Sequence, residues 1–470
     1  MTWLHLECGE HREVEMSDTA RKIRLGAFIM ATGHHIAAWR HPAADANAGH
    51  SIDHYRGLAQ TAQKGLFDLV FVADSPGGWD GDRDPEIRSR VSHSAHFEPV
   101  TLWSALSQVT SNIGFVATAS TTYEDPYLLA RKFASLDHIS KGRAAWNVVT
   151  TGADVSKNFS IAGHPAHANR YERAEEVVDL VLDLWDSYED DALIVDKDSG
   201  VFLDPAKVHK VDHHGQFFDV AGPLNVARSP QGRPVVVQAG ASEAGRNLAA
   251  RTAEVIFTAN QTLADGQEFY SDIKGRLAKH GRRPEQLLIM PGLFPVLGGT
   301  EAEAKANYEF IQSLVHPSIA WGILKQYYVG VDLSGYSLDD KAPPLPTETE
   351  LNKSRLKLVS DLARTGLTLR ELYLSLATAR GHRTAVGTPE QIADALVEWF
   401  DNGAADGFNI MPPVLPTGLT DFVDQVVPIL QKRGLYRTEY EGTTLRENLG
   451  LERPINRFVA RANQQQRSAS

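Results

Sequence analysis

The chain has 470 residues, of which 42% are hydrophobic and 23% charged, proportions typical of a globular protein that lives in water. Asp and Glu outnumber Lys and Arg by 59 to 47, which gives a formal net charge of −12 at pH 7. A chain this acidic, without a basic tract or an apolar run approaching the roughly 20 residues of a membrane span, is a poor partner for nucleic acid or a membrane.

The N-terminal 20 residues are polar and predict a flexible extension, or upstream sequence read from an early start, since Met16 precedes the first apolar run. Residues 1–8 lack the basic region and apolar core of a signal peptide. The single cysteine, Cys8, excludes an intramolecular disulfide framework and suits a reducing compartment. We therefore expect a cytoplasmic protein.

Apolar runs of strand length alternate with capped or amphipathic helical segments along the chain. The strands are predicted to begin near Leu25, Leu69, Ile113, Ala144, Val235, Val255, Leu287 and Phe408. Strands that alternate with helices indicate a parallel sheet, and eight such units fit a closed (β/α)8 TIM barrel, an α/β fold. A doubly wound open sheet is the alternative architecture.

The predicted barrel spans residues 21–448 as a single domain with insertions at about 75–97, 189–233 and 316–383. The first insertion is a long polar loop, and such loops are usually functional. The second, with Phe217-Phe218-Asp219-Val220 and several turn signals, predicts a β-hairpin region. The polar tail, 449–470, is expected to fray or to lie as an arm over a partner subunit.

Hydroxyl residues gather where two neighbouring predicted strands end. They are Thr118, Ser120, Thr121, Thr122, Thr150 and Thr151. In parallel sheets ligands sit at the carboxyl ends of the strands. The sequence therefore predicts a binding site at this edge before any family is considered.

Two further segments follow strands. Asp74 stands at a strand end, where a carboxylate either lines a site or caps the following loop, two interpretations of equal weight. Ser242 and Arg246 open a helix after Gly240, a pattern suited to phosphate, although a plain N-cap with a solvated arginine is as good an interpretation. A hydrolase nucleophile elbow is disfavoured because Ala244 stands where that motif requires glycine.

Histidines supply the remaining candidates. His167 and Tyr171 are four apart and would share a helix face beside Arg170, although a surface histidine with a core tyrosine is the ordinary interpretation. His41, in the first strand–helix loop, is a candidate for acid–base work. The other clustered histidines are His34, His35, His209, His213 and His214. We predict no metal site, since H-E-x-x-H and C-x-x-C are absent. The absence of G-x-G-x-x-G and of a P-loop disfavours a Rossmann site or an ATPase.

Several longer motifs carry a resemblance to a known family. They are Ala117-Thr118-Ala119-Ser120-Thr121-Thr122-Tyr123, Ser140-Lys141-Gly142-Arg143, Trp146-Asn147-Val148-Val149-Thr150, His167-x-x-Arg170-Tyr171, Pro205-Ala206-Lys207-Val208-His209, Ser229-Pro230-Gln231-Gly232 and Val386-Gly387-Thr388-Pro389-Glu390. Over roughly residues 22–450 the chain resembles the bacterial luciferase-like flavin monooxygenases, in the branch with nitrilotriacetate, EDTA and dibenzothiophene-sulfone monooxygenases.

The resemblance implies a (β/α)8 barrel that binds reduced FMN delivered by a separate NAD(P)H:flavin reductase. O2 would add at flavin C4a, and the peroxyflavin would pass one oxygen atom to a small organic substrate, with cleavage of a C–N, C–S or sulfone bond. The flavin contacts carried over by motif are Asp74, Thr118, His167, Tyr171 and Ser242. A homodimer or homotetramer is expected.

The resemblance also implies a non-prolyl cis peptide at Ala117–Thr118. His41 and His382 are candidates for polar groups on the substrate or peroxide side. The substrate stays open, because the loop 74–96 and the insertion 316–383 are where members of the family differ. Two other functions remain as alternatives: an F420- or flavin-binding oxidoreductase of the same barrel without oxygenase activity, and a metal-dependent hydrolase.

Overall fold

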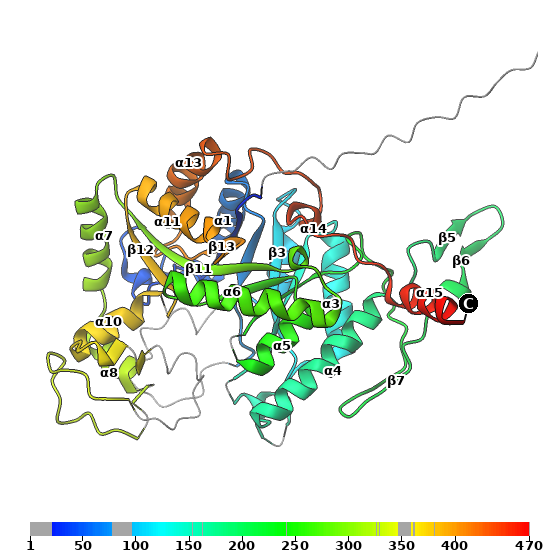
Figure 1. Ribbon diagram of the computed structural model, residues 1–470, viewed down its shortest axis with the longest axis horizontal. Helices are drawn as coiled ribbons and strands as arrows, with labels where there is room; N and C mark the ends of the chain where they lie inside the picture. Colours follow the sequence, from blue (N-terminus) through cyan, green and yellow to red (C-terminus); the bar gives the residue numbers. More distant parts are fainter. Residues whose placement is uncertain are drawn as a thin grey trace, which may run out of the picture.

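The computed structural model of the protein describes residues 21–77, 96–345 and 359–469, except positions 153, 162, 241, 326, 329, 361 and 380. Its centre is a ring of parallel strands (Figure 1). The strands are β1 (Arg24–Phe28), β2 (Leu69–Val72), β3 (Gly114–Ser120), β4 (Ala144–Val149), β9 (Val235–Ala239), β10 (Val255–Thr258), β11 (Leu288–Leu297) and β13 (Gly407–Ile410). All eight predicted strands are confirmed.

The ring closes on itself. β1 pairs with β13, β13 with β11, and β11 with β10, which completes the order from β9 through β4, β3 and β2 back to β1. This closure confirms the TIM barrel and excludes the open sheet. A ninth strand that the sequence did not predict, β12 (Arg383–Gly387), pairs in parallel with the second half of β11.

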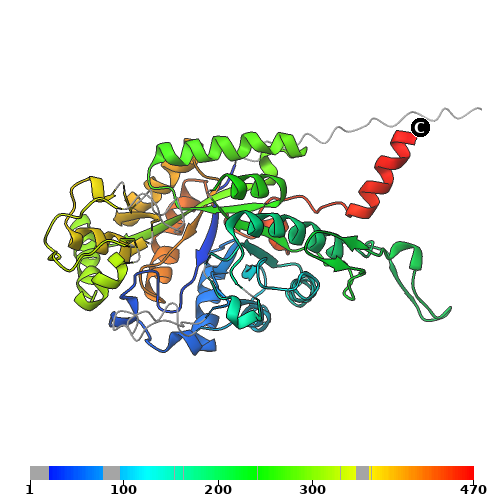
Figure 2. The same cartoon turned by 90° about the horizontal axis from the view of Figure 1, so that it is seen from below.

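Helices form the outer layer of the barrel (Figure 2). The main ones are α1 (Ile52–Lys64), α2 (Pro99–Leu106), α3 (Pro126–Ile139), α4 (His167–Trp185), α5 (Glu243–Thr252), α6 (Leu263–Leu277), α7 (Glu301–Ser313) and α11 (Pro389–Asp401). Side-chain oxygens that accept backbone N–H groups start most of them, at Ser51, Asp125, Ser242, Thr262, Thr300 and Thr388. The described loops contain six short 3-10 helices, at Ala38–Arg40, Ala48–His50, Ser156–Phe159, Pro205–Lys207, Ala278–His280 and Pro284–Gln286.

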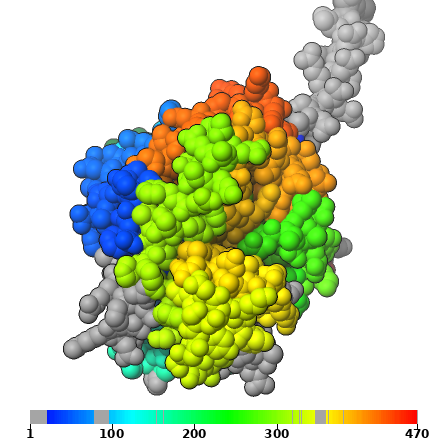
Figure 3. Space-filling model, turned by 90° about the vertical axis from the view of Figure 1, so that its left-hand side faces the viewer, coloured from blue at the N-terminus to red at the C-terminus, as the bar shows by residue number. Residues whose placement is uncertain are grey.

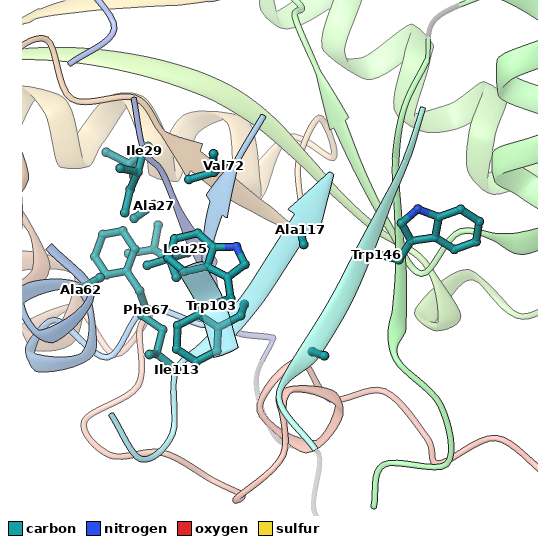
Figure 4. Close-up of a cluster of buried hydrophobic side chains, with 14 of the residues drawn as sticks. Leu25, Ala27, Ile29, Ala62, Phe67, Val72, Trp103, Ile113, Ala117 and Trp146 are labelled. Carbon is teal, nitrogen blue, oxygen red and sulfur yellow. The ribbon is translucent and has the colours of Figure 1, made fainter. Parts of the chain in front are cut away.

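The largest core cluster lies between strands and helices (Figure 4). Leu25 and Ala27 alternate along β1 and so share one face of the strand. Two indoles anchor the layer through hydrogen bonds to strand carbonyls: Trp103 Nε1 donates to Val116 O at 2.9 Å, and Trp146 Nε1 to Ala119 O at 3.2 Å. Alternation then turns the intervening residues, such as Val116, to the barrel interior, where they form a second cluster.

Two of the three predicted insertions lie mostly within the described residues. Residues 189–233 contain two antiparallel pairs, β5 (Leu193–Asp196) with β6 (Val201–Leu203) and β7 (His213–His214) with β8 (Asp219–Val220), as the hairpin prediction required. The insertion 316–383 contains α8 (Pro317–Lys325) and α10 (Leu369–Ala379) around its own apolar cluster. It covers one end of the molecule below α7 (Figure 3). The insertion 75–97 lies mostly outside the described residues.

The C-terminal part of the chain runs along the amino-terminal face of the barrel and ends in a helix. After α12 (Thr417–Asp421), a π-helical turn (Phe422–Val426) and α13 (Val427–Lys432), the chain forms α14 (Leu445–Asn448) and α15 (Arg457–Ala469). Residues 457–469 form a helix, so the prediction of a frayed tail is wrong there, whereas the arm over a partner subunit stays a prediction. Within the described residues, no helix combines the length and apolar character that crossing a membrane requires.

Buried ion pairs hold this C-terminal part to the amino-terminal face of the barrel. Arg446, on α14, donates from Nη1 and Nη2 to Glu254, just before β10. Burial opposes ionisation of Glu254, but Arg446 and Arg233 prevail and lower its pKa to about 2. In the same way Arg437 Nη2 lies 2.6 Å from Asp68 Oδ1, just before β2, with both side chains almost fully buried.

We expect Arg446→Met to destabilise the protein at pH 7 by about 3–5 kcal/mol, because it leaves the Glu254 carboxylate buried without its main partner. Folding lowers the pKa of Glu254, so the stabilisation exists above the ordinary pKa of 4.5 and disappears as the pH falls towards about 2. Urea-unfolding midpoints followed by circular dichroism measure both effects. The matched control, Arg446→Met with Glu254→Gln, should recover part of the loss, and equal midpoints for wild type and Arg446→Met would contradict the assignment.

Candidate active site

Two polar side chains meet inside the barrel near the carboxyl ends of β3 and β4. Thr118 pairs in register with Asn147, and both side chains are buried. Thr118 Oγ1 donates to Val72 O at 2.9 Å and accepts from Asn147 Nδ2 at 2.9 Å. Asn147 Oδ1 is buried and has no hydrogen-bond partner among the described residues. The pair therefore leaves one amide oxygen ready to accept a hydrogen bond in the barrel interior.

Most of the other predicted hydroxyls join the ends of β3 and β4 to each other. Ser120 Oγ lies 2.6 Å from Thr151 Oγ1, and Thr121 Oγ1 donates to Val149 O at 3.1 Å. All three residues are buried. The hydroxyl cluster thus exists as predicted, and its first effect is to fix the shape of this rim of the barrel.

Asp74 lies at the end of β2, and its carboxylate accepts from across the long loop. His96 Nε2 is 2.9 Å from Asp74 Oδ1, and both side chains are partly exposed. The contact joins the two described ends of the 75–97 insertion. The Asp74 side chain therefore lies at the rim of the barrel and fixes the base of the loop through this contact.

Ser242 caps α5 and also contacts Tyr171 of α4. Ser242 Oγ accepts from Gly245 N at 3.1 Å and donates to Tyr171 Oη at 3.1 Å. Gly245 makes the contact possible: a Cβ there would lie 3.1 Å from Ser242 Oγ and 3.2 Å from Tyr171 Oη. Two hydroxyls thus stand together at a helix N-terminus, an arrangement suited to an anion such as phosphate.

Arg246 does not support this cradle in the way the sequence suggested. Its Nη1 donates to Asp272 Oδ2 on α6 at 2.8 Å, so the guanidinium is engaged in an ion pair between α5 and α6. His167 is the first residue of α4, but its side chain lies outside the described part of the structure. The predicted His167–Tyr171 face is therefore described only for Tyr171.

A network that the sequence did not reveal lies beside this helix start. His164 Nδ1 is 2.6 Å from Tyr123 Oη, and Arg170 Nη1 is 2.8 Å from His164 Nε2. Arginine only donates, so Nε2 accepts and the neutral ring donates from Nδ1 to Tyr123. Burial and the Arg170 charge lower the pKa of His164 and keep the ring neutral. Phe159 stacks on Tyr123 with ring centroids 5.0 Å apart.

The two histidines proposed for the substrate side lie in different surroundings. His41 Nδ1 accepts from Ala43 N at 3.1 Å, and its ring packs edge-on against Phe310 of α7. His382 precedes β12 and packs on β11, where a Cβ at Gly292 would lie 2.3 Å from its Nδ1. Partial burial lowers the pKa of His41. His382 thus lies against a barrel strand, whereas His41 packs on an outer helix.

The other histidine cluster is structural. His209 Nε2 donates to Glu189, within the insertion, and His213 Nε2 donates to Glu176 on α4, each at 2.9 Å. Glu176 also accepts from the backbone of Phe218 at 2.9 Å. No group of three or more His, Cys, Asp or Glu side chains with metal-binding geometry occurs among the described residues.

The suspected cis peptide at Ala117–Thr118 is a wrong prediction. The cis bonds in the described part of the chain are the prolyl bonds Gly222–Pro223 and Leu415–Pro416. The segment at Ala117–Thr118 is regular strand, paired with Trp146 and Asn147 of β4.

Comparisons with known proteins agree with this barrel. The family model described as luciferase-like monooxygenase matches residues 28–406, so the chain belongs to the luciferase-like monooxygenase family, a class of flavin-dependent enzymes. The chain is 53% identical to N-acetyl-S-(2-succino)cysteine monooxygenase of Bacillus subtilis, over 94% of this chain and 100% of that one.

It is also 48% identical to nitrilotriacetate monooxygenase component A of Aminobacter aminovorans, over 93% of this chain and 98% of the relative. Among solved structures, riboflavin lyase RcaE, determined with modified FMN and riboflavin, superposes with a TM-score of 0.81 at 34% identity. That likeness covers 93% of this chain and 98% of RcaE.

We expect Thr118→Val to destabilise the protein by about 1–3 kcal/mol, because it leaves Val72 O and Asn147 Nδ2 buried without their shared partner. The control Thr118→Ser keeps the hydroxyl and should lose less. Urea-unfolding midpoints of the three proteins test this expectation. Valine and serine variants of equal stability would show that the hydroxyl bridge contributes nothing.

Proposed function

We propose that the protein is the oxygenase component of a two-component monooxygenase that uses reduced FMN. The observation that carries the proposal is the Ser242–Tyr171 hydroxyl pair at the start of α5, which suits a flavin phosphate. Family membership supports flavin as the cofactor. That the flavin is FMN, and that it binds in its reduced state, are further parts of the proposal.

The residues of this chain fit the cofactor at both of its ends. Tyr171 Oη, which accepts from Ser242 Oγ and keeps its own proton, and the first N–H groups of α5 are donors for a phosphate, and Gly245 lets the two hydroxyls converge. Towards the barrel interior, the buried Asn147 Oδ1 is an acceptor suited to an N–H of an isoalloxazine ring. We assign flavin contacts to Asp74, Thr118, His167, Tyr171 and Ser242.

Bound reduced FMN would supply the electrons that activate O2, so that one oxygen atom enters the substrate and the other leaves as water. The protein then has to hold the ring, orient the substrate and keep water out. The loop with Phe159 and His164 closes over Tyr123, and Val155 of this loop packs against Gly77, where a Cβ would lie 2.1 Å from it. We assign His382 and His41 to polar contacts with the substrate.

The proposed substrate is a small organic molecule whose C–S or C–N bond is cleaved after oxygenation. The relatives at 53% and 48% identity are named for N-acetyl-S-(2-succino)cysteine and nitrilotriacetate. Both compounds carry several carboxylates around a C–S or C–N centre, so we favour a polycarboxylate. The proposed partner is a separate NAD(P)H:flavin reductase, and the protein would work in the cytoplasm.

Gly245→Ala should weaken FMN binding about 10-fold, because the added methyl pushes Ser242 and Tyr171 apart. The matched control is Gly275→Ala in α6, where a Cβ meets nothing within 4 Å. It should leave FMN affinity unchanged and raise stability slightly. Titration of flavin fluorescence gives the affinity for reduced FMN under anaerobic conditions and for oxidised FMN under aerobic conditions.

Ser242→Ala and His167→Ala should also weaken FMN binding without unfolding the protein, since Ser242 positions the Tyr171 hydroxyl and His167 is a proposed phosphate donor. Unchanged affinity in Gly245→Ala, Ser242→Ala and His167→Ala together would place the phosphate elsewhere.

The activity itself is tested with the purified chain, a generic NADH:flavin reductase and FMN, in an oxygen-electrode assay. We expect O2 uptake coupled to product formation with N-acetyl-S-(2-succino)cysteine or nitrilotriacetate, and dependence on all three components. Flavin binding without substrate-dependent O2 uptake, but with hydride transfer to an acceptor, would favour the oxidoreductase alternative over the oxygenase.

A further inference from the structure

A cavity of about 470 Å³ lies between the amino-terminal face of the barrel and the C-terminal segment 451–460. One part of its wall is formed by the end of α5 and the loop 281–286 before β11, and another by the C-terminal segment. Figure 2 shows α15 standing clear of the barrel at this end. The volume is within the range of about 300–1,000 Å³ that is typical of small-molecule sites. Ser242 and Tyr171 lie at the other end of the barrel, so this cavity is separate from the proposed flavin site.

Arginines dominate the charge of this lining. Six arginines and three carboxylates line the cavity: Arg233, Arg251, Arg282, Arg446, Arg453 and Arg457, with Asp179, Glu254 and Glu452. We call it the arginine cavity. Three of the arginines, Arg446, Arg453 and Arg457, are matched by close carboxylates of the same chain. The other three, Arg233, Arg251 and Arg282, therefore decide what the cavity can bind.

Arg282 is held by main-chain carbonyls rather than by a carboxylate. Its Nη1 donates to Ala250 O at 2.9 Å, and its Nη2 donates to Ala253 O at 2.6 Å and to Gln286 O at 2.7 Å. The carbonyls at the end of α5 carry only the partial negative charge of a helix C-terminus. They fix the guanidinium in place without cancelling its charge. Burial lowers the pKa of Arg282, and the Arg233 charge acts in the same direction.

Arg251 and Arg233 each carry a buried donor that no described residue accepts from. Arg251 Nη1 donates to Asp179 Oδ2 at 2.6 Å, but its Nη2 is buried without a hydrogen-bond partner among the described residues. The same holds for Arg233 Nε, whose Nη1 makes only a long contact of 3.5 Å with Asp186 Oδ2. A buried donor without an acceptor is unfavourable. These two positions therefore favour a ligand that brings acceptor oxygens.

We propose that the arginine cavity binds a small organic anion that carries a phosphate group. Arg233, Arg251 and Arg282 come from three separate segments of the chain, and a tetrahedral phosphate can accept from donors that approach it from several directions. The lining also contains apolar side chains for the organic part of such a ligand, among them Leu182, Leu451 and Ala460.

A ligand in this cavity bridges the barrel and the C-terminal segment. The three arginines that decide binding belong to the barrel, whereas Arg453 and Arg457 belong to the C-terminal segment on the other part of the wall. Because the ligand binds the folded chain, it stabilises that chain by mass action. The site thus links the concentration of a phosphorylated compound to the attachment of the C-terminal segment.

The first test is calorimetric titration of the full chain with inorganic pyrophosphate at constant ionic strength. We expect saturable binding of one pyrophosphate per chain. Arg282→Gln should weaken it at least 10-fold, because it removes the cation that no carboxylate neutralises. Ala460→Trp keeps every arginine and fills the cavity with an indole, so it should weaken binding to the same extent, with unchanged circular dichroism. The matched control is Arg370→Gln, a partly exposed arginine in the insertion 316–383, which should bind as wild type does.

Two further arms separate this site from other anion sites. Ser242→Ala should bind pyrophosphate as tightly as wild type, because it alters only the other end of the barrel. Pyrophosphate should raise the melting temperature of wild type and Arg370→Gln but not that of Ala460→Trp. Absence of binding overturns the proposal, and so does binding that survives Arg282→Gln and Ala460→Trp or is lost in Ser242→Ala. Citrate that binds as tightly as pyrophosphate would overturn the assignment to phosphate.

Discussion

The closure of the parallel ring is the constraint on which the rest of the molecule depends. Because β10 pairs with β11 and β1 with β13, all eight strands point the same way around one axis. Their carboxyl ends then form one rim and their amino ends the other. Closure needs close approach at Gly26, where a Cβ would lie 2.7 Å from Leu69 and 3.0 Å from Asn409 Oδ1. A larger residue would force β1 away from both neighbours.

The two rims differ in how they use polar groups. At the amino-terminal rim, charges are buried and paired, as in Asp68 with Arg437 and Glu254 with Arg446. Such pairs are costly to break but need not add to net stability, so their clearest effect is to fix the C-terminal segment in one position. At the opposite rim the buried Asn147 amide and the Ser242 and Tyr171 hydroxyls face the barrel mouth, while the charged Asp74 and Arg170 contact His96 and His164 at its edge. The amide and the two hydroxyls can accept a ligand without first giving up an ion pair.

Elements that depend on an apolar pattern can be predicted from the sequence. Contacts between residues far apart in the chain are much harder to predict. The eight ring strands were found because each is an apolar run, whereas β12 was missed because Arg383–Gly387 is mostly half-exposed and alternates poorly. Ser242 and Tyr171 were singled out separately, and the fold brings them within 3.1 Å. The Tyr123–His164 contact was missed because 41 residues separate its members and neither stands in a periodic pattern.

Closeness in the sequence is also a poor guide to contact at the start of α5. Arg246 lies close to Ser242 in sequence, but α6 offers it Asp272, and an ion pair at 2.8 Å decides its direction. Several motifs that carry the family resemblance turn out to support the scaffold. Gln231 Nε2, buried, donates to Asp137 Oδ1 at 2.7 Å and to Ala144 O at 2.8 Å, which ties the loop before β9 to β4. Resemblance therefore identified the family partly through residues that never need to touch a ligand.

The positions of the β5–β6 hairpin and of α15 follow from the same topology. α4 starts at the carboxyl rim, after β4, and so ends at the amino rim, where residues 189–233 are inserted before β9. The helix α15 reaches that rim through α14, whose Arg446 is bound there by Glu254. Both segments therefore stand at the amino rim, at the opposite end of the barrel from Ser242, Tyr171 and Asn147.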